Sequence, residues 1–402
     1  MKLFEPALIG SCRLKNRIIR SATFEGMADQ QGHPLQEYRL LYKELASGGV
    51  GGIITGFVYI SPDGRAMHPG QVGIDRQEMV EYLLPVTDEV HKYDCKIFMQ
   101  LAHTGRQTRK KETGQDIWGV SKKKSLYFGG SPRVLSTEQV YLLIKRFAEA
   151  ASYAQAAGFD GVQVHAAHGY LIHQFLLPTI NRRNDEFGID AKSRIGTRFL
   201  GLVIDQIRKK CGQDFALLVK ASGSDDYFTR FTTEQFVSLI QFLDVQKVDG
   251  IEISYGTMDN ALNIFRGEIP HKVVIKHNPV FKANNGITKM LYNALIYCLM
   301  RRKLKPFTPA YNLKYAELAK SLTGIPIISV GGFRKGEEMR RCLENGVIDF
   351  ISMCRPFICE PDLAEKLEHD RNYSAKCINC NICAIMCDSD QPTRCYRNDF
   401  DL

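Results

Sequence analysis

Several features of secreted, membrane-spanning and dinucleotide-binding proteins are missing from this 402-residue sequence. No run approaches 18 apolar residues, which argues against a transmembrane helix. The stretch from Met1 to Pro6 lacks the charged and apolar regions of a signal peptide, so we expect a cytoplasmic protein. No G-x-G-x-x-G motif occurs, so a Rossmann dinucleotide site is not predicted. Tryptophan occurs only once, at Trp118, which argues against an aromatic cage for a cationic substrate.

Acidic residues are almost absent between residues 261 and 315. This segment holds ten Lys or Arg against a single acid, Glu268, so its net charge of +9 equals that of the whole chain. It is either a solvated basic insertion or an electropositive rim that steers an anionic substrate, such as a CoA ester, or an acidic electron-transfer protein. Nucleic-acid binding is not predicted, because no recognition module accompanies the charge. Residues 289–303 could form a lid helix with a basic end.

Cysteines are concentrated near the C-terminus. Cys377, Cys380 and Cys383 follow one another at three-residue intervals, and Cys387 and Cys395 come after them. Clustered thiols in a cytoplasmic protein favour metal or redox chemistry over disulfides. Four thiolates, the fourth from Cys395 or from Cys387, could hold an iron–sulfur cluster or a zinc ion.

Short β-branched runs alternate with amphipathic helical stretches up to about residue 370. Eight such runs followed by helices predict a closed parallel (β/α)8 barrel, the TIM barrel, over residues 1–370. Residues 261–315 would be an insertion after the sixth strand, and residues 371–402 a cysteine-rich extension that binds the cluster. The predicted strands are 17–21, 52–55, 96–100, 161–165, 216–220, 250–254, 326–330 and 349–352.

Barrel enzymes carry their active sites at the carboxyl ends of the strands. Gln100 ends the third strand, and its amide can donate to and accept from the edge of a heteroaromatic ring such as a flavin. His165 and His168 leave the fourth strand three residues apart, where both could bind one ligand oxygen, and Tyr170 offers a phenol as a proton donor.

The remaining strand ends carry groups that suit an anionic cofactor. Lys220 ends the fifth strand and could hold negative charge on a reduced ring, or could form an ion pair with Glu252. Gly331 and Gly332 follow the seventh strand, and Arg355 follows the eighth. Backbone N–H groups and an arginine at these places are typical of a barrel phosphate site.

These motifs together resemble the old yellow enzyme family of FMN-dependent barrels. The resemblance covers essentially residues 1–370 and rests on several stretches in the expected order. They are 16–23 (NRIIRSAT), 100–106 (QLAHTGR), the His165, His168 and Tyr170 group with 175–185 (FLLPTINRRND), and Gly331-Gly332 with Arg355.

The resemblance implies a role for each residue of the site. Gln100 and the backbone of Ala22 and Thr23 would hold the flavin pyrimidine ring, and Lys220 would lie near flavin N1. The phosphate of FMN would be bound by Gly331, Gly332 and Arg355. His165 and His168 would bind the substrate carbonyl and Tyr170 would protonate the α-carbon. Phe24 stands where relatives often have Thr or Cys.

The C-terminal cysteines resemble a branch of this family that includes 2,4-dienoyl-CoA reductase and trimethylamine dehydrogenase, whose barrels carry a [4Fe–4S] cluster. This implies a cluster on Cys377, Cys380, Cys383 and Cys395. We therefore expect an NAD(P)H-dependent FMN enzyme that reduces activated C=C bonds in an enone, enoate or enoyl thioester. An amine dehydrogenase that passes electrons through the cluster, or an electron-transfer subunit of a larger complex, remain alternatives.

Overall fold

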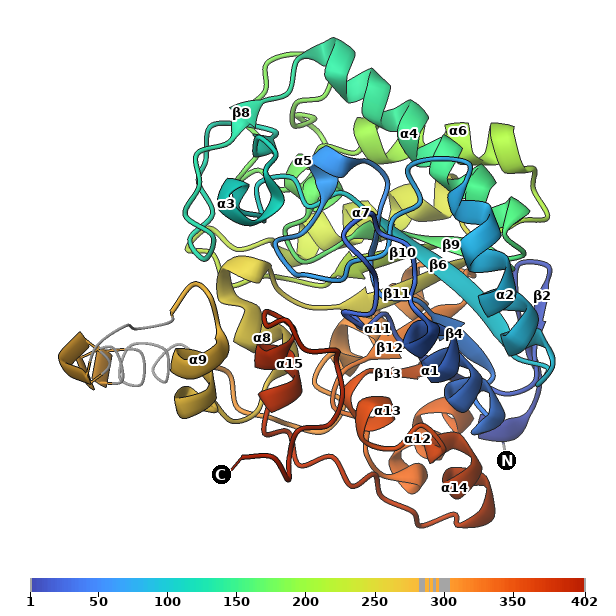
Figure 1. Cartoon of the computed structure of the whole chain (residues 1–402). Helices are drawn as coiled ribbons and strands as arrows, with labels where there is room; N and C mark the ends of the chain where they lie inside the picture. Colours follow the sequence, from blue (N-terminus) through green and yellow to red (C-terminus); the bar gives the residue numbers. More distant parts are fainter. Residues whose placement is uncertain (1, 282–285, 289, 292–293, 296–303, 401–402) are drawn as a thin grey trace.

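Eight parallel strands close into a barrel in the computed structural model, which describes residues 2–281, 286–288, 290–291, 294–295 and 304–400 (Figure 1). Neighbouring strands pair in chain order, and the last pairs with the first, which closes the sheet. The predicted (β/α)8 barrel is therefore confirmed. Its strands are β3 (Ile18–Arg20), β4 (Gly52–Ile54), β6 (Lys96–Ala102), β9 (Gly161–Ala166), β10 (Ala216–Ser222), β11 (Gly250–Ser254), β12 (Ile327–Val330) and β13 (Phe350–Met353).

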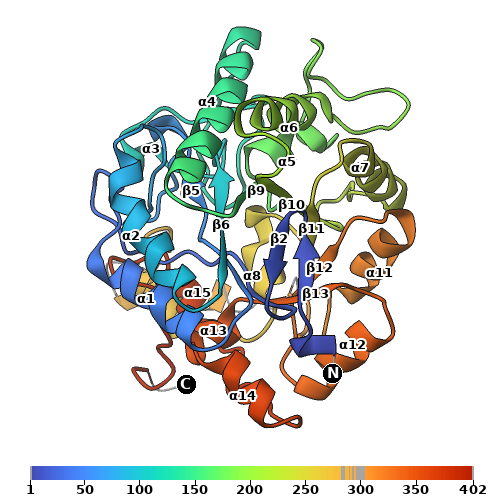
Figure 2. The ribbon, with the colours of Figure 1, turned by 90° about the vertical axis from the view of Figure 1, so that its right-hand side faces the viewer.

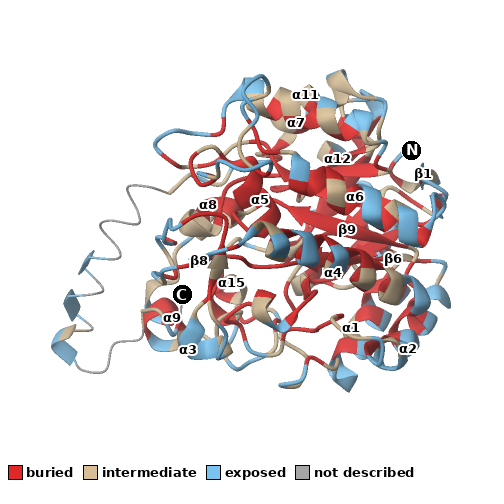
Figure 3. Cartoon of the chain, turned by 90° about the horizontal axis from the view of Figure 1, so that it is seen from above, coloured by how far each residue is buried: buried red, intermediate tan, exposed pale blue. Residues whose placement is uncertain are grey.

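Helices surround the strands (Figure 2), and the side of each helix that faces the strands is buried (Figure 3). Capping boxes at Ser136 and Thr232 define where α4 and α7 begin, because each hydroxyl accepts a hydrogen bond from the N–H of the glutamine three residues later. The outer helices are α1 (Gln36–Ser47), α2 (Met79–His91), α4 (Thr137–Ala156), α6 (Arg198–Cys211), α7 (Thr233–Val245), α11 (Leu313–Leu322), α12 (Gly336–Glu344) and α14 (Leu363–His369).

A hairpin of β1 (Ala7–Ile9) and β2 (Cys12–Leu14) covers the amino-terminal end of the barrel (Figure 2). Ile9 and Leu14 are fully buried in one apolar cluster with the inward-facing Phe98 and Phe350. This packing fills the barrel at the amino-terminal ends of the strands, so the open end of the barrel lies at the strand carboxyl ends. The sequence patterns above did not predict the hairpin.

The insertion and the C-terminal segment pack together beside the open end of the barrel. Helices α8 (Ala261–Phe265), α9 (His271–His277) and α15 (Ile382–Met386) lie close to one another (Figure 1) and bury Leu262, Val274 and Ile382 in one apolar cluster. Most of the predicted lid helix, 289–303, lies outside the described residues. No helix in the described part of the chain is long and apolar enough to cross a membrane.

Short elements connect these parts. They are η1 (Lys2–Phe4), β5 (Val58–Tyr59), η2 (Pro62–Gly64), α3 (Lys110–Thr113), β7 (Trp118–Gly119), β8 (Arg133–Val134), α5 (Leu171–Leu176), η3 (Met258–Asn260) and α13 (Arg355–Cys359).

Candidate active site

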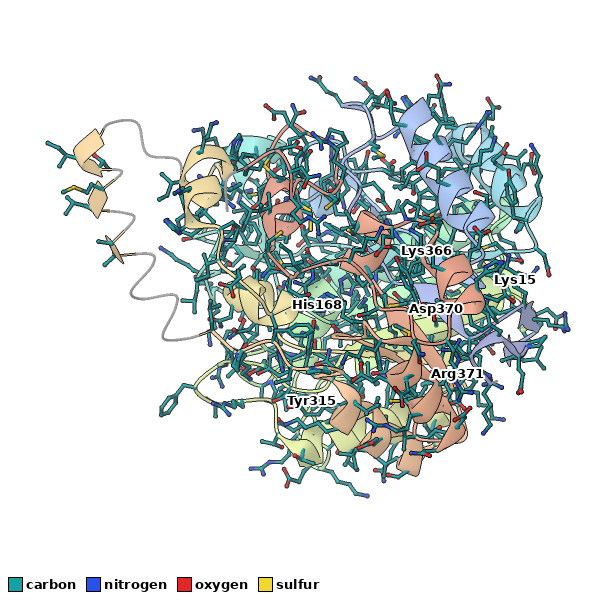
Figure 4. All side chains as sticks on the ribbon, turned by 90° about the horizontal axis from the view of Figure 1, so that it is seen from below. Lys15, His168, Tyr315, Lys366, Asp370 and Arg371 are labelled. Atoms are coloured by element: carbon teal, nitrogen blue, oxygen red, sulfur yellow. The ribbon has the colours of Figure 1, made fainter. Side chains whose placement is uncertain are left out.

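A cavity of about 680 Å³ lies at the carboxyl ends of the strands. Every residue that we predicted for catalysis or flavin binding lines it, except the glycine pair 331–332. Other walls come from barrel loops, from residues 261–265 of the insertion, and from Cys383, Ile385 and Asp388 of the C-terminal segment, among others. In the view from below, His168 lies well inside the outline of the molecule, whereas Lys15 lies at its edge (Figure 4). The size is typical of a site for a cofactor and a small substrate.

The two histidines and Tyr170 form one group at the end of β9. The ring of His165 lies 5.0 Å from that of His168 and 4.9 Å from that of Tyr170, centroid to centroid. His168 has a left-handed backbone (φ 61°), which turns the chain after the strand and returns its side chain to the cavity. Its Nε2 lies 2.8 Å from Ser254 Oγ. The buried Nδ1 of His165 has no hydrogen-bond partner among the described residues, so it is free for a ligand.

Burial sets the protonation of these three side chains. It lowers the pKa of His165 well below the usual value for imidazole, and the positive charge of Lys220 adds to this effect. The pKa of His168 is lowered by burial, by His165 and by Lys220. Burial raises the pKa of the Tyr170 phenol. Near neutral pH, each imidazole therefore carries one N–H donor and no charge, and the phenol keeps its proton.

A network of buried polar side chains crosses the barrel beneath the cavity. Gln100 Nε2 donates to Gln163 Oε1 (2.7 Å), and Gln163 Nε2 donates to Glu252 Oε2 (2.9 Å). Lys220 Nζ lies 3.0 Å from Glu252 Oε2 and donates to Ser21 Oγ (2.9 Å). The ion pair between Lys220 and Glu252, one of the two roles considered for Lys220, is therefore present. The network holds the ends of Gln100 and Lys220 in place, because every partner is itself bound.

Our sequence reasoning missed three members of this network, Ser21, Gln163 and Ser352. Ser21 and Ser352 donate to Glu252 Oε1 over 2.5 and 2.7 Å. Gln163 lies between Val162 and Val164, and it faces the barrel interior two residues before His165 in a fully buried strand. A polar side chain at a position facing the barrel interior was the available signal, because it must find a partner there.

Aromatic rings form the wall of the cavity next to Tyr170. Phe57 stacks on Tyr170 with 5.3 Å between centroids, and Phe24 lies 5.6 Å from Phe57 and 5.1 Å from His68. His68 Nδ1 in turn lies 2.6 Å from Oδ1 of Asp388, and both side chains are buried. Phe24 therefore belongs to an aromatic wall, and the C-terminal segment reaches the cavity through Asp388.

Asp388 also joins the loops around the cavity. Its Oδ2 accepts a hydrogen bond from Tyr127 Oη (3.0 Å) and another from Asn278 Nδ2. One carboxylate thus connects the C-terminal segment to the insertion and to two loops of the barrel. Sequence reasoning had not singled out Asp388.

The end of the cavity near β12 and β13 differs from the expected phosphate site in one respect. Arg355 lines the cavity, but Gly331 and Gly332 do not. The segment 308–312 lies against the two glycines instead: a Cβ on Gly331 would lie 2.5 Å from the Tyr311 ring, and one on Gly332 would lie 2.6 Å from the backbone N of Ala310. The close approach that a missing side chain permits is used here by segment 308–312 of the same chain, which packs against both glycines.

The C-terminal cysteines divide between two cavities. A small cavity of about 20 Å³ is lined by Cys359 together with Cys377, Cys380, Cys383 and Cys395. Cys383 also lines the large cavity, whereas Cys387 lines only the large one, and its Sγ donates to the carbonyl oxygen of Cys383 (3.2 Å). No group of three or more His, Cys, Asp or Glu in the described ranges is arranged to hold a metal ion.

Comparisons with known proteins agree with this fold. The sequence profile of the NADH:flavin oxidoreductase / NADH oxidase family matches residues 2–264 and 276–374. The NADH oxidase of Thermoanaerobacter brockii is 29% identical over 388 residues, which cover 95% of this chain and 53% of that protein. The cinnamate reductase of Clostridium sporogenes is 27% identical over 392 residues, which cover 94% of this chain and 54% of that protein.

The solved structure of a 2-naphthoyl-CoA reductase in complex with 2-naphthoyl-CoA superposes with a TM-score of 0.81 at 22% identity, over 99% of this chain and 57% of that one. The chain thus spans about half the length of these relatives. The profile match covers nearly the whole barrel, and the resemblance inferred from the strand-end motifs is confirmed at the level of the family. The chain belongs to the NADH:flavin oxidoreductase / NADH oxidase family.

Proposed function

We propose that this chain is an FMN-dependent oxidoreductase that takes electrons from NAD(P)H and reduces C=C bonds conjugated to a carbonyl or thioester. The observation that carries the proposal is the group of two neutral imidazoles and a protonated phenol in one buried cavity with Gln100, Lys220 and Arg355. The sequence relative named as a cinnamate reductase supports this reaction type.

The residues present suit FMN. An amide, an ammonium group and a guanidinium group line the same cavity, at Gln100, Lys220 and Arg355, and they match the pyrimidine edge, the N1 region and the phosphate of the cofactor. Bound FMN would supply a hydride. Ala22 and Thr23, which line the cavity directly after β3, would contribute backbone groups. Gly331 and Gly332 would contribute only if the segment 308–312 moved away from them.

The side chains around the substrate would then have separate tasks. His165 and His168 would each donate a hydrogen bond to the substrate oxygen, and these bonds would strengthen as negative charge develops there. Tyr170 Oη would deliver the proton to the α-carbon. The aromatic wall of Phe24, Phe57 and Tyr170 would exclude water and pack against an unsaturated substrate.

Direct mixing experiments test the reaction. The flavin absorbance of anaerobically reduced protein should return when cinnamate, an enone or an enoyl-CoA ester is added. Aryl-substituted alkenes should react faster than short alkyl-substituted ones, because of the aromatic wall. A CoA ester that reacts faster at low salt would support steering by the basic insertion. A protein that binds no flavin, or whose reduced flavin is reoxidised by none of these alkenes, would refute the proposal.

The oxidation of an amine is a second candidate. The carboxylate of Asp388 lies at the aromatic wall, where it could attract a cationic amine, although His68 already pairs with it (2.6 Å). Secondary and tertiary amines belong in the same panel. An amine that reduces the oxidised flavin while no alkene reoxidises the reduced flavin would favour this candidate.

We further propose that residues 371–402 hold a [4Fe–4S] cluster on Cys377, Cys380, Cys383 and Cys395. These four thiols line one small cavity, and thiolates are the usual ligands of such clusters. To bind a cluster, the loop would have to bring the thiols closer together than they lie in this structure. Cys387 is less suited, because it does not line the small cavity that these four thiols share. Zinc would use the same ligands, and metal analysis separates the two.

Two matched cysteine variants test the fourth ligand. Cys395→Ser should abolish cluster absorbance and the electron paramagnetic resonance signal of the reduced protein, because one of four thiolates is lost. Cys387→Ser should keep both signals. The reverse pattern, or zinc in place of iron in the purified protein, would refute this ligand set.

A further inference from the structure

Two arginines lie between the flavin site and the cysteine loop 377–383. Arg334 follows β12 by four residues, and Arg355 follows β13 by two. Both therefore stand just after the strand ends where barrels bind phosphate. Each guanidinium also contacts the cysteine loop. The loop that would carry the cluster is therefore bonded directly to the end of the cavity that would hold the phosphate of FMN.

Arg355 is held by three acceptors in this structure. Its Nη1 donates to Asn381 Oδ1 (2.5 Å) and to the carbonyl oxygen of Arg266 (2.9 Å), and its Nη2 donates to the carbonyl oxygen of Phe265. The two carbonyls belong to the insertion, whereas Asn381 lies between Cys380 and Cys383. A phosphate could replace the two neutral carbonyls, because a charged acceptor binds a guanidinium more strongly.

Asn381 is itself placed by the backbone of the cysteine loop. It has a left-handed backbone (φ 58°), it is 1% exposed, and its Nδ2 donates to the carbonyl oxygen of Glu268 (3.0 Å). Asn379 has a similar left-handed backbone (φ 60°), but its side-chain oxygen accepts from Arg334, whose Nη2 also lies 3.7 Å from Cys377 Sγ. Asparagine tolerates this backbone region better than most residues, so both positions depend on how the loop is folded.

We infer that Asn381 is a positioning residue that couples cluster assembly to FMN binding. The inference rests on the proposed function, which supplies both cofactors. A cluster on Cys380 and Cys383 would hold the loop in one conformation and keep Asn381 against Arg355. The guanidinium would then be preorganised for the phosphate, and FMN would bind more tightly to the cluster-loaded protein than to the cluster-free protein.

The experiment compares dissociation constants of FMN, measured by quenching of flavin fluorescence, for protein with its cluster and for protein freed of iron by a chelator. The wild-type chain should bind FMN about 10-fold more tightly with the cluster. Asn381→Ala should reduce this ratio to about one. Riboflavin, which lacks the phosphate, should show little dependence on the cluster in either protein.

Asn379→Ala is the matched control, because it removes the neighbouring asparagine of the same loop without touching Arg355. It should keep the wild-type ratio. Any of four results would overturn the coupling alone. They are equal FMN affinity with and without the cluster, an unchanged ratio in Asn381→Ala, an equal loss in Asn379→Ala, and an equal cluster effect on riboflavin. A protein that binds no FMN in any preparation would overturn the proposed function together with the coupling.

Discussion

His165→Ala should lower the turnover of a reducible alkene by about 10²–10³-fold, the usual cost of losing one donor to a developing oxyanion. The bound flavin should be retained, because His165 lies on the substrate side of the cavity in our assignment. The double variant His165→Ala/His168→Ala should lose more activity, but less than the product of the two single effects, because both donors serve one oxygen. Steady-state kinetics and the flavin content of the purified protein measure the two properties.

His91→Ala provides the matched control, because His91 pairs with Asp160 (2.8 Å) at the amino-terminal side of the barrel. It should leave turnover near the wild-type value. The low pKa of both site histidines also predicts that activity does not follow an imidazole titration between about pH 6 and pH 8. Full alkene turnover in His165→Ala would show that another group binds the substrate oxygen.

Lys220→Met should destabilise the cofactor-free protein by about 3–5 kcal/mol at pH 7, because it leaves the carboxylate of Glu252 buried without its cation. Both side chains are almost completely buried, with side-chain exposures of 3% and 0%. Three neutral donors would remain around Glu252, from Ser21, Gln163 and Ser352. The free energy of unfolding in urea measures the effect. The same variant should bind FMN more weakly, because it loses the ammonium group that we propose lies near flavin N1.

The pH dependence of this effect has a definite sign. Burial alone would raise the pKa of Glu252, but Lys220 and the three hydrogen bonds together hold this pKa below its usual value. In the wild type, Glu252 therefore adds stability above its unfolded pKa, about 4.3, and this contribution is lost as the pH falls through the lower folded pKa. Without Lys220, burial should raise the pKa of Glu252, so the carboxyl group takes up a proton more readily. The stability difference between variant and wild type should then shrink from pH 7 to pH 5.

Lys320→Met is the matched control for this variant. Lys320 pairs with Asp349 over 2.8 Å, but its side chain is 28% exposed, so its loss should cost no more than about 1 kcal/mol. The double variant Lys220→Met/Glu252→Gln should be more stable than Lys220→Met alone, because the amide carries no buried charge. A stability difference that grows as the pH falls would contradict the assignment of the charges.

The barrel could be predicted from local patterns, because each strand is a short buried run and helices α4 and α7 begin at capping boxes that the sequence shows. The eight predicted strands agree with the structure to within about two residues at each end. The candidate site followed from one rule about strand ends, which brought Gln100, His165 and Lys220 to one cavity. The hairpin β1–β2 was not predicted, because its two strands have only three residues each and depend on the barrel beneath them.

By itself, the sequence determined the order of strands and helices, the family, and the chemical groups that gather at the open end of the barrel. These depend on residue type and on short-range spacing. Only the tertiary structure decided the partners: Glu252 with Lys220, Asp388 with His68, Asn381 with Arg355, and the segment 308–312 over the glycine pair. The physical reason is that a buried polar group must be satisfied by whichever partner the fold brings near, and that partner can stand hundreds of residues away in the chain.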